Sequence, residues 1–283
     1  MHPACDDRRV PQSLELNDGS TLPALGFGLY KVPPAETTDV VAAGLAAGYR
    51  LIDGAELYGN ERELGEALRR ADASGLDRDD LTVTSKFWGE SSQEPAAVRA
   101  AFDASERALG RIDVYMIHWP RPARDRYVDV WCTLVALQAE GRVRTIGVSN
   151  FTEEHLRRII GETGVTPAIN QVESHPWLPQ RELRRAHAAL GIVTQAWSPL
   201  GRSRVLADPA IRRIAAAHGV TPAQAVIRWH LQTGGALVPK STHPHRLREN
   251  LDVDGFRLSD ADMAAIAALE TGERTGTHPD ERN

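Results

Sequence analysis

The sequence has 283 residues, of which 42% are hydrophobic and 25% charged, and its formal net charge is -5. This is ordinary usage for a soluble globular protein, and the absence of a long basic run argues against nucleic acid as the main ligand. No apolar run approaches the roughly 20 residues that a membrane helix needs. Two cysteines, Cys5 and Cys132, provide neither a disulfide framework nor zinc spacing. We therefore expect a soluble cytoplasmic protein that binds neither nucleic acid nor membranes.

The first predicted element is a β-hairpin. Residues 1–12 are expected to be a loose tail at the start of a single domain that spans 1–283. Apolar residues at 14–16 and 22–25 flank Asn17-Asp18-Gly19, a sequence typical of a hairpin turn. Apolar strands and amphipathic helices then alternate to near the end of the chain. Eight strands are predicted, at residues 26–30, 50–53, 81–86, 114–118, 145–149, 168–173, 192–197 and 236–240.

The helices between these strands carry recognisable start signals. Asn60 followed by Glu63 predicts a capping box, and Thr152 predicts an N-cap. Thr221 followed by Pro222 predicts a cap with a first-turn proline. These signals place helices where a strand–helix alternation requires them.

The spacing of the strand ends predicts the architecture. Successive ends from Asp53 to Ser149 are 33, 32 and 31 residues apart, and the longer last interval leaves room for two helices. One strand, one helix and two short loops need about 25 to 35 residues. Eight such units, with apolar strands, predict a parallel (β/α)8 TIM barrel with an N-terminal β-hairpin and extra C-terminal helices. An open doubly wound sheet is the alternative, but no Gly-x-Gly-x-x-Gly follows the first strand.

Polar side chains stand at the ends of most of these strands. In a barrel of this kind the site lies at the C-terminal ends of the strands. A few such residues could be helix caps, but so many at one rim favour a functional site. They are Asp53, Lys86, His118, Ser149 with Asn150, Gln171, Trp197 with Ser198, and Lys240 with Ser241.

Four residues suggest carbonyl chemistry. Lys86 beside Asp53 would form a buried charge pair, and a lysine close to the phenol of Tyr58 would lower the tyrosine pKa. Tyr58 would then be a general acid, and His118 could donate a hydrogen bond to the same substrate oxygen. Such a group suits protonation of an oxygen that gains negative charge, as when a carbonyl accepts hydride. A metal site is the weaker hypothesis, because no His-Glu-x-x-His occurs.

Short motifs stand in a specific order and spacing along nearly the whole chain. They are Leu25-Gly26-Phe27-Gly28, Leu51-Ile52-Asp53-Gly54-Ala55, Tyr58-Gly59-Asn60-Glu61, Thr84-Ser85-Lys86, Ile117-His118-Trp119-Pro120, Ile146-Gly147-Val148-Ser149-Asn150-Phe151, Asn170-Gln171-Val172-Glu173, His175-Pro176, and Pro239-Lys240-Ser241 with Arg246, Glu249 and Asn250. Each motif alone is weak, whereas their order and spacing together are specific. Together they resemble the aldo-keto reductase superfamily, and in particular its small bacterial 2,5-diketo-gluconate-reductase-like members.

The resemblance implies a catalytic tetrad of Asp53, Tyr58, Lys86 and His118, the four residues that the chemistry suggested. It also implies an NADP(H) cofactor extended across the barrel without a Rossmann fold. Trp197 would stack on the nicotinamide, and its carboxamide would bind Ser149, Asn150 and Gln171. The remaining cofactor contacts implied are Ser198, Leu200 and Gly201 at the pyrophosphate, Lys240, Ser241 and Arg246 at the 2′-phosphate, and Asn250 near the adenine.

Three positions depart from the family pattern. Gly54 replaces a residue that usually carries a hydroxyl, Trp197 replaces the commoner tyrosine or phenylalanine, and His243 stands where relatives can carry arginine. Tyr30, Trp88 and Trp119, with Phe27 as a further candidate, would wall a small open substrate pocket. Plain barrel packing is the alternative explanation of these aromatic residues.

These observations predict an NADPH-dependent aldo-keto reductase that reduces a small aldehyde or ketone, such as a keto-sugar or dicarbonyl, to an alcohol. The family's usual form implies a monomer. One alternative is an NADP(H)-binding sensor or regulatory protein with low turnover on the same fold. Another is a barrel hydrolase or isomerase that ignores nicotinamide cofactors.

Overall fold

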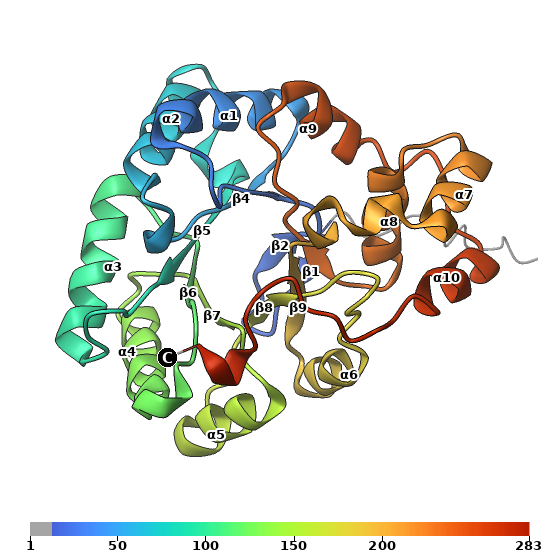
Figure 1. Ribbon diagram of the computed structural model, residues 1–283. Helices are drawn as coiled ribbons and strands as arrows, with labels where there is room; N and C mark the ends of the chain where they lie inside the picture. Colours follow the sequence, from blue (N-terminus) through green and yellow to red (C-terminus); the bar gives the residue numbers. More distant parts are fainter. Residues whose placement is uncertain (1–12, 283) are drawn as a thin grey trace, which may run out of the picture.

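The computed structural model describes residues 13–282 and contains eight parallel strands that form a barrel (Figure 1). Each strand pairs with the next in chain order, from β3 to β10. A parallel bridge between Leu25 and Leu237 joins the first strand to the last, where Gly26 N donates to Leu237 O at 2.9 Å. The strands are β3 (Phe27–Gly28), β4 (Leu51–Asp53), β5 (Thr82–Phe87), β6 (Val114–Ile117), β7 (Thr145–Ser149), β8 (Ile169–Glu173), β9 (Val193–Trp197) and β10 (Ala236–Leu237).

All eight predicted strands and the barrel are confirmed, although β3 and β10 are each three residues shorter than predicted. β10 ends before Pro239, whose nitrogen has no hydrogen to donate to a neighbouring strand. β3 has only two residues, and Gly28 N still reaches Pro239 O at 3.2 Å. The barrel therefore continues around this side through single hydrogen bonds instead of long ladders.

The predicted hairpin lies across the bottom of the barrel. β1 (Ser13–Glu15) pairs antiparallel with β2 (Thr21–Pro23). Leu16 and Leu22 are buried in one cluster with apolar side chains inside the barrel. The hairpin thus closes the end opposite the strand C-termini. Residues 1–12, predicted to be a loose tail, lie outside the described residues, and the single-domain assignment stays a prediction.

Ten α-helices of the described chain surround the barrel (Figure 1). Two of them stand between β9 and β10, as the long last interval predicted, and two follow β10. They are α1 (Pro34–Ala47), α2 (Glu61–Ala73), α3 (Pro95–Leu109), α4 (Tyr127–Ala139), α5 (Glu153–Thr163), α6 (Arg181–Leu190), α7 (Pro209–His218), α8 (Pro222–Gln232), α9 (Pro244–Leu251) and α10 (Asp260–Ala267).

One of the predicted helix starts is wrong in detail. Thr152 and Thr221 cap α5 and α8 through their side chains, as predicted. Asn60 precedes α2 but makes no capping hydrogen bond. Its side-chain amide donates instead to the carbonyl oxygens of Leu29 and Val32, at 3.2 and 3.0 Å. Asn60 therefore fixes the loop after β3 to the start of α2, which holds two walls of the barrel mouth together.

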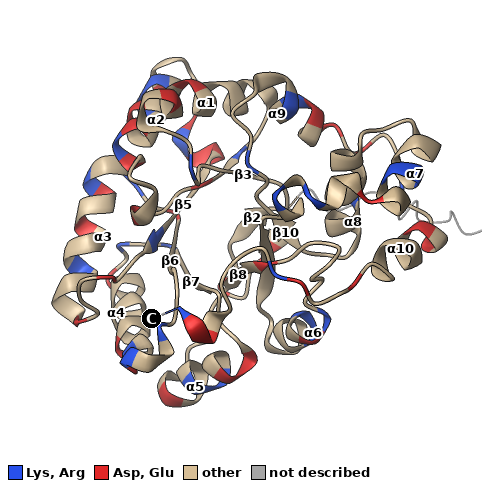
Figure 2. Cartoon of the chain, viewed as in Figure 1, with Lys and Arg blue, Asp and Glu red and all other residues tan. Residues whose placement is uncertain are grey.

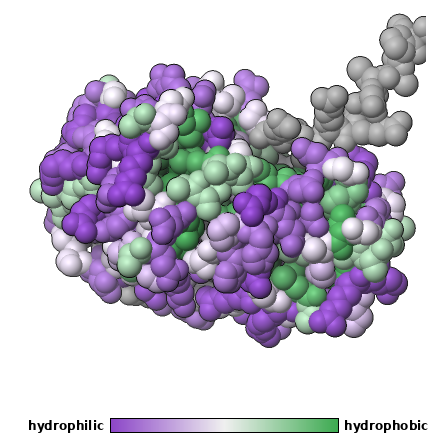
Figure 3. All heavy atoms as spheres, turned by 90° about the horizontal axis from the view of Figure 1, so that it is seen from above, coloured by the Kyte–Doolittle hydropathy of each residue, from purple (hydrophilic) through white to green (hydrophobic). Residues whose placement is uncertain are grey.

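The largest apolar cluster lies between the barrel and helices α1 to α5. Trp131 and Phe102 are fully buried there, on α4 and α3. Apolar burial contributes roughly 25 cal/mol per Å² removed from water, so this layer dominates the stability of the barrel. Charged residues occupy mainly the outward faces of the helices (Figure 2), and hydrophilic residues cover most of the face seen in Figure 3. Within residues 13–282, no helix is long and apolar enough to cross a membrane.

Candidate active site

A cleft of about 220 Å³ opens where the barrel strands end, and most of the predicted site residues line it. Parallel strands bring their C-terminal ends to one rim, so residues far apart in the sequence meet there. Asp53 ends β4, Ser149 ends β7 and Trp197 ends β9. The lining consists of Gly28, Tyr30, Asp53, Leu57, Tyr58, Trp88, His118, Trp119, Ser149, Asn150, Gln171, Trp197, Ser198, Arg202, Val238, Lys240, Gly276, Thr277 and Arg282.

Lys86 and Asp53 form a buried ion pair beneath the cleft. Lys86 Nζ donates to Asp53 Oδ1 at 2.7 Å and to Gly54 O at 2.8 Å, and the lysine is fully buried. Asp53 Oδ1 also accepts from Thr84 Oγ1 at 2.8 Å and from Gln171 Nε2 at 2.7 Å. A buried pair is tolerable when such hydrogen bonds satisfy both charges. The third contact of the ammonium is the Tyr58 hydroxyl, 3.3 Å away.

Tyr58 ends a short 3-10 helix, η1 (Glu56–Tyr58), directly after β4. Burial raises the pKa of the Tyr58 phenol well above its usual value, and the negative charge of Asp53 adds to the effect. The predicted lowering of this pKa is therefore wrong: burial and Asp53 outweigh the nearby ammonium. At neutral pH the phenol keeps its proton, so the structure presents a proton held ready at the cleft.

His118 faces Tyr58 across the cleft. Its ring centroid lies 5.9 Å from that of Tyr58 and 5.1 Å from that of Trp88. Burial lowers the pKa of His118 well below its usual value, and the charges of Lys86 and Arg121 lower it further. Nδ1 is buried with no hydrogen-bond partner in the described structure, which favours the tautomer that carries its proton on Nε2. His118 is thus a neutral imidazole.

Gly54 fits tightly where the family usually has a hydroxyl residue. Gly54 N donates to Thr84 O at 3.0 Å, and a Cβ at this position would lie 3.0 Å from the same oxygen. The loop between Asp53 and Tyr58 still directs Gly54 O towards Lys86. Glycine at this position therefore leaves the acid–ammonium–phenol geometry in place.

A chain of hydrogen bonds links the polar residues on the other side of the cleft. Trp197 Nε1 donates to Asn150 Oδ1 at 2.8 Å, and Asn150 Nδ2 donates to Ser149 Oγ at 3.0 Å. Ser149 Oγ in turn donates to Gln171 O at 2.8 Å. Asn150 adopts a left-handed backbone conformation, φ 64°, which turns its side chain back towards β9. The indole of Trp197 is thereby held at the cleft wall.

The structure divides the predicted cofactor residues into two groups. Ser149, Asn150, Gln171, Trp197, Ser198 and Lys240 line the cleft. Leu200, Gly201, Ser241, Arg246 and Asn250 do not; they lie on the segments that follow β9 and β10. The first group therefore shares the rim, as predicted. The second group remains a set of predicted contacts of a cofactor that extends beyond the cleft.

The predicted substrate pocket is only partly correct in its composition. Tyr30, Trp88 and Trp119 all line the cleft. Phe27 does not, because it is fully buried and packs edge-on against Tyr49 at 5.2 Å. The alternative of plain barrel packing is therefore correct for Phe27. Side chains alternate between the two faces of a strand, so the aromatic residues at 27 and 30 need not share a face.

The part of the cleft that comes from the last described segment was not predicted from the sequence. Residues 268–282, here called the strap, run from α10 across the barrel mouth to the 3-10 helix η6 (Pro279–Glu281) (Figure 1). Gly276, Thr277 and Arg282 of the strap line the cleft. No strand-end spacing or motif marks them, since they reach the cleft only through tertiary contacts. Leu57 and Arg202, on the segments after β4 and β9, also line the cleft and were not predicted.

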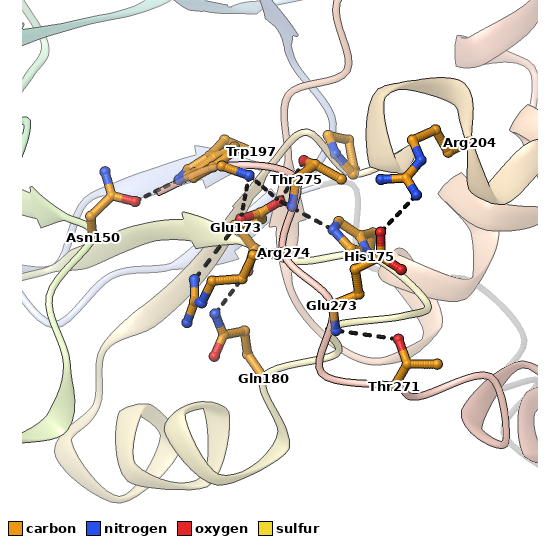
Figure 4. Close-up of polar contacts among 12 residues, drawn as sticks. Asn150, Glu173, His175, Gln180, Trp197, Arg204, Thr271, Glu273, Arg274 and Thr275 are labelled. Atoms are coloured by element: carbon orange, nitrogen blue, oxygen red, sulfur yellow. Dashed lines mark hydrogen bonds and ion pairs between the residues drawn. The ribbon is translucent and has the colours of Figure 1, made fainter. Parts of the chain in front are cut away.

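One buried carboxylate fastens the middle of the strap to the barrel (Figure 4). Glu173, the last residue of β8, accepts hydrogen bonds from Thr275 N at 2.6 Å and from Gly276 N at 3.2 Å. His175 Nε2 lies 3.2 Å from the same carboxylate. Gly276 rests against Trp197, where a Cβ would come within 2.5 Å of the indole ring. The strap and the cleft wall are therefore in direct contact.

The cleft combines a protonated phenol, an ammonium beside it and a neutral imidazole opposite. This set can deliver a proton to an oxygen that is gaining negative charge. The phenol supplies the proton, and the ammonium stabilises the phenolate that remains. The flat indole of Trp197 and the polar side chains next to it form a wall of the cleft against which a planar ring can bind.

Comparison with known proteins gives consistent results. The model of the aldo/keto reductase family matches residues 24–271. The chain is 42% identical to methylglyoxal reductase DkgA of Escherichia coli (strain K12) over 274 residues, covering 96% of this chain and 98% of that protein. It is 44% identical to 2,5-diketo-D-gluconic acid reductase B of Corynebacterium sp. (strain SHS752001) over 270 residues, covering 95% and 96%. A crystal structure of a Gox0644 mutant in complex with NADPH superimposes with a TM-score of 0.91 at 44% identity, covering 96% and 98%.

Proposed function

The chain belongs to the aldo/keto reductase family, and on this premise we propose that it is an NADPH-dependent carbonyl reductase. It reduces a small aldehyde or ketone to an alcohol. The observation that carries the proposal is the contact of the Tyr58 hydroxyl with Lys86 Nζ at 3.3 Å, opposite a neutral His118 in the same cleft.

The substrate's carbonyl oxygen binds between the Tyr58 hydroxyl and His118. The cofactor, when bound, supplies the hydride that reaches the carbonyl carbon. Tyr58 gives its proton to the oxygen as negative charge develops there, and the phenolate left behind is stabilised by Lys86. Neutral His118 donates a hydrogen bond from Nε2 and orients the carbonyl. Asp53 keeps the ammonium in position, and solvent later returns a proton to Tyr58.

The residues present fit a nicotinamide dinucleotide. Trp197 offers an aromatic face on the cleft, and Gln171 Oε1 has no hydrogen-bond partner within residues 13–282. A carboxamide could donate to that oxygen while the ring stacks on the indole. Lys240, exposed after β10, adds a positive charge to the same cleft. Aromatic, amide and cationic groups in this order suit the ring, the carboxamide and the phosphates of the cofactor.

The contacts beyond the cleft are assigned by family likeness. Ser198, Leu200 and Gly201 would bind the pyrophosphate. Lys240, Ser241 and Arg246 would bind the 2′-phosphate, and Asn250 would lie near the adenine. Arg246 is exposed on the first turn of α9, so its guanidinium is free to reach a phosphate. The NADPH complex of Gox0644 supports the choice of a phosphorylated cofactor.

The substrate is proposed to be a small carbonyl compound such as a dicarbonyl or a keto-sugar. Two relatives are named for the reduction of methylglyoxal and of 2,5-diketo-D-gluconic acid. Tyr30, Trp88 and Trp119 supply apolar walls for such a molecule. We also propose that the protein acts as a cytoplasmic monomer. In the described chain only Tyr30 and Leu57 are large exposed hydrophobic residues, and both belong to the cleft.

Replacing Tyr58 with phenylalanine tests the proposal. Tyr58→Phe should keep NADPH binding but lower kcat for carbonyl reduction by about 10²–10⁴-fold, the usual contribution of a positioned general acid. NADPH absorbance would be followed against a panel of aldehydes, diketones and keto-sugars, with cofactor binding measured by fluorescence. The NADPH affinity of the variant is the internal control, because an unchanged affinity shows that the cleft is intact.

Two outcomes would contradict the proposal. Turnover of Tyr58→Phe close to that of the wild type would remove Tyr58 from its role as proton donor. Tight NADPH binding by the wild type without oxidation on the whole panel would favour the sensor or regulatory protein with low turnover.

A further inference from the structure

Gln195 places a polar side chain inside the barrel, beneath the cleft. It lies on β9 directly opposite Gln171 of β8, so both side chains point to the same side of the sheet. Gln171 lines the cleft, whereas Gln195 does not and is fully buried. Val193, two residues earlier on β9, packs against the apolar cluster inside the barrel. Gln195 therefore stands between the cleft and the apolar interior.

The two glutamines and Asp53 form one chain of hydrogen bonds. Gln171 Nε2 donates to Asp53 Oδ1 and to Gln195 Oε1, in both cases at 2.7 Å. An amide nitrogen carries two hydrogens, so both are used. The amide oxygen of Gln171 is thereby left as an acceptor for a ligand in the cleft.

Neither of these amides can be turned over. If the oxygen and nitrogen of Gln171 were exchanged, Oε1 would lie 2.7 Å from Asp53 Oδ1, and two acceptors would face each other. If those of Gln195 were exchanged, its nitrogen would face the donating nitrogen of Gln171. The orientation of the Gln171 amide is therefore fixed from two sides, by a carboxylate and by a second amide.

This arrangement leaves one donor unsatisfied. Gln195 Nε2 is buried and has no hydrogen-bond partner within residues 13–282. Buried polar groups are normally paired, and the interior of a barrel of this kind is filled mostly by branched apolar residues. Packing alone therefore does not explain an amide at position 195. What the amide provides is its oxygen, which accepts from Gln171.

We propose that Gln195 is a positioning residue, which fixes the Gln171 amide so that the cleft selects a cofactor ring carrying an N–H donor. The inference rests on the proposed function, because it concerns the nicotinamide that the same cleft would bind. Gln171 Oε1 accepts a hydrogen bond from the carboxamide NH2 group of that ring. Gln195 touches neither cofactor nor substrate and acts only through Gln171.

An amide fixed in advance favours the carboxamide in two ways. Gln171 loses little rotational freedom when the cofactor binds, which favours affinity. A ring substituent without an N–H group leaves Gln171 Oε1 unpaired, and an amide held from two sides cannot turn away to relieve this loss. A glutamine held by Asp53 alone could turn about that single contact, so it would discriminate less against such a ring.

Binding of two oxidised cofactors tests the inference. NADP⁺ carries a carboxamide, whereas its 3-acetylpyridine analogue carries an acetyl group of similar shape without an N–H. Dissociation constants of the whole chain would be measured by protein fluorescence. The wild type should bind NADP⁺ about tenfold more tightly than the analogue, since the analogue forgoes one hydrogen bond. Gln195→Met, which keeps the length of the side chain, should reduce this ratio about threefold or more, by weakening the binding of NADP⁺.

Three further variants show how Gln195 acts. Gln195→Glu keeps an acceptor oxygen and should keep the ratio of the wild type. The double variant Gln171→Met with Gln195→Met should have the ratio of Gln171→Met alone, because the two residues act as one unit. Gln138→Met is the matched control, since it removes a glutamine that donates to Arg144 O on α4, outside the cleft. It should leave the ratio unchanged.

Thermal unfolding separates positioning from a merely structural role. Gln195→Met removes one unpaired N–H group and leaves another at Gln171 Nε2, so its Tm should be close to that of the wild type.

Equal binding of both cofactors by the wild type, or an unchanged ratio in Gln195→Met, would overturn the inference and leave the reductase function intact. A ratio lost in Gln195→Glu as fully as in Gln195→Met would also overturn it, because the acceptor oxygen would then be irrelevant. If the wild type bound neither cofactor, the proposed function itself would be contradicted.

Discussion

Lys86 is the residue on which the geometry of the candidate active site depends most. Its ammonium is fully buried and donates to Asp53 and Gly54 O at 2.7 and 2.8 Å. Burial lowers the pKa of Lys86, whereas the charge of Asp53 raises it. The pair is thus stable only as a pair, because either charge alone would be buried without compensation.

Replacing Lys86 with methionine should therefore cost more stability than a simple loss of contacts. Lys86→Met leaves the Asp53 carboxylate buried, and we expect a loss of about 3–5 kcal/mol in the free energy of unfolding. Urea denaturation at pH 7 measures it. The double variant Asp53→Asn with Lys86→Met removes both charges, and the new amide oxygen can still accept from Thr84, so it should be more stable than Lys86→Met alone. Asp53→Asn alone completes the comparison. If the loss in the double variant equals the sum of the losses in the two single variants, the charges do not stabilise each other.

Residue types at strand ends were predictable from the sequence, whereas their ionisation was not. The identities of Asp53, Tyr58, Lys86 and His118 follow from spacing and from the family motifs. The raised pKa of Tyr58 does not, because it depends on how much water the folded cleft excludes and on the charge of Asp53. A sequence indicates which groups are neighbours but not how dry their surroundings are.

At the scale of elements, the strap is the part of the cleft that is least like a barrel. It belongs to no strand–helix unit, and its middle is held by Glu173, whose carboxylate accepts from Thr275 N and Gly276 N. Hydrogen bonds from His175 and Thr275 lower the pKa of Glu173 against the effect of burial. A charged carboxylate therefore fastens the strap that carries Arg282 to the cleft.

Glu173→Gln should loosen the strap. The substituted side chain would keep one acceptor oxygen for Thr275 N, but it would lose the negative charge, and its NH2 group would face Gly276 N and Arg274, which now contact Glu173 Oε2, a loss of about 1–3 kcal/mol. Local opening of residues 271–282 should become about tenfold or more frequent, which hydrogen–deuterium exchange of that peptide measures. KM for carbonyl substrates should rise at the same time, because the strap lines the cleft.

Glu273→Gln is the matched control for this element. It makes the same substitution within the strap, but Glu273 pairs with Arg204 on the exposed surface. An exposed ion pair contributes about 0–1 kcal/mol, so exchange of the strap should hardly change. Equal exchange in both variants would mean that Glu173 does not hold the strap.

Strands and helices of the barrel were predictable because each has a local signal. The apolar strand runs, the threonine caps and the near-constant spacing of the first units are all readable from short stretches of sequence. The strap has no such signal, since its residues after α10 are polar and bind the barrel through Glu173, about 100 residues earlier in the chain. The failed capping box at Asn60 has a similar cause, because a tertiary contact used the side chain that local rules assign to the helix.

At the scale of the whole molecule, the barrel buries several histidines as neutral groups. Burial lowers the pKa of His187 to about 4 and that of His230 to about 3. His187 Nε2 lies 2.9 Å from Asn170 Nδ2, so it accepts there, and Nδ1 donates to Thr194 Oγ1 at 2.8 Å. A proton on Nε2 would break this arrangement. The fold is therefore built for a neutral imidazole between α6 and the barrel.

These histidines predict a loss of stability in mild acid. An unfolded histidine binds a proton below a pH of about 6.5, whereas His187 in the folded protein stays neutral down to a pH of about 4. Between these values the unfolded state holds the extra proton, so the free energy of unfolding falls as the pH falls, by about 1.4 kcal/mol per pH unit for each such group.

His187→Gln should be less stable at pH 7, because it loses the fit to Asn170 and Thr194. Between pH 6.5 and 4.5 the free energy of unfolding of this variant should change less with pH than that of the wild type, by about 1.4 kcal/mol per pH unit. Urea denaturation at several pH values measures this difference. His245→Gln, at an exposed position on α9, should keep the slope of the wild type. If His187→Gln also keeps it, protonation of His187 does not contribute to acid unfolding.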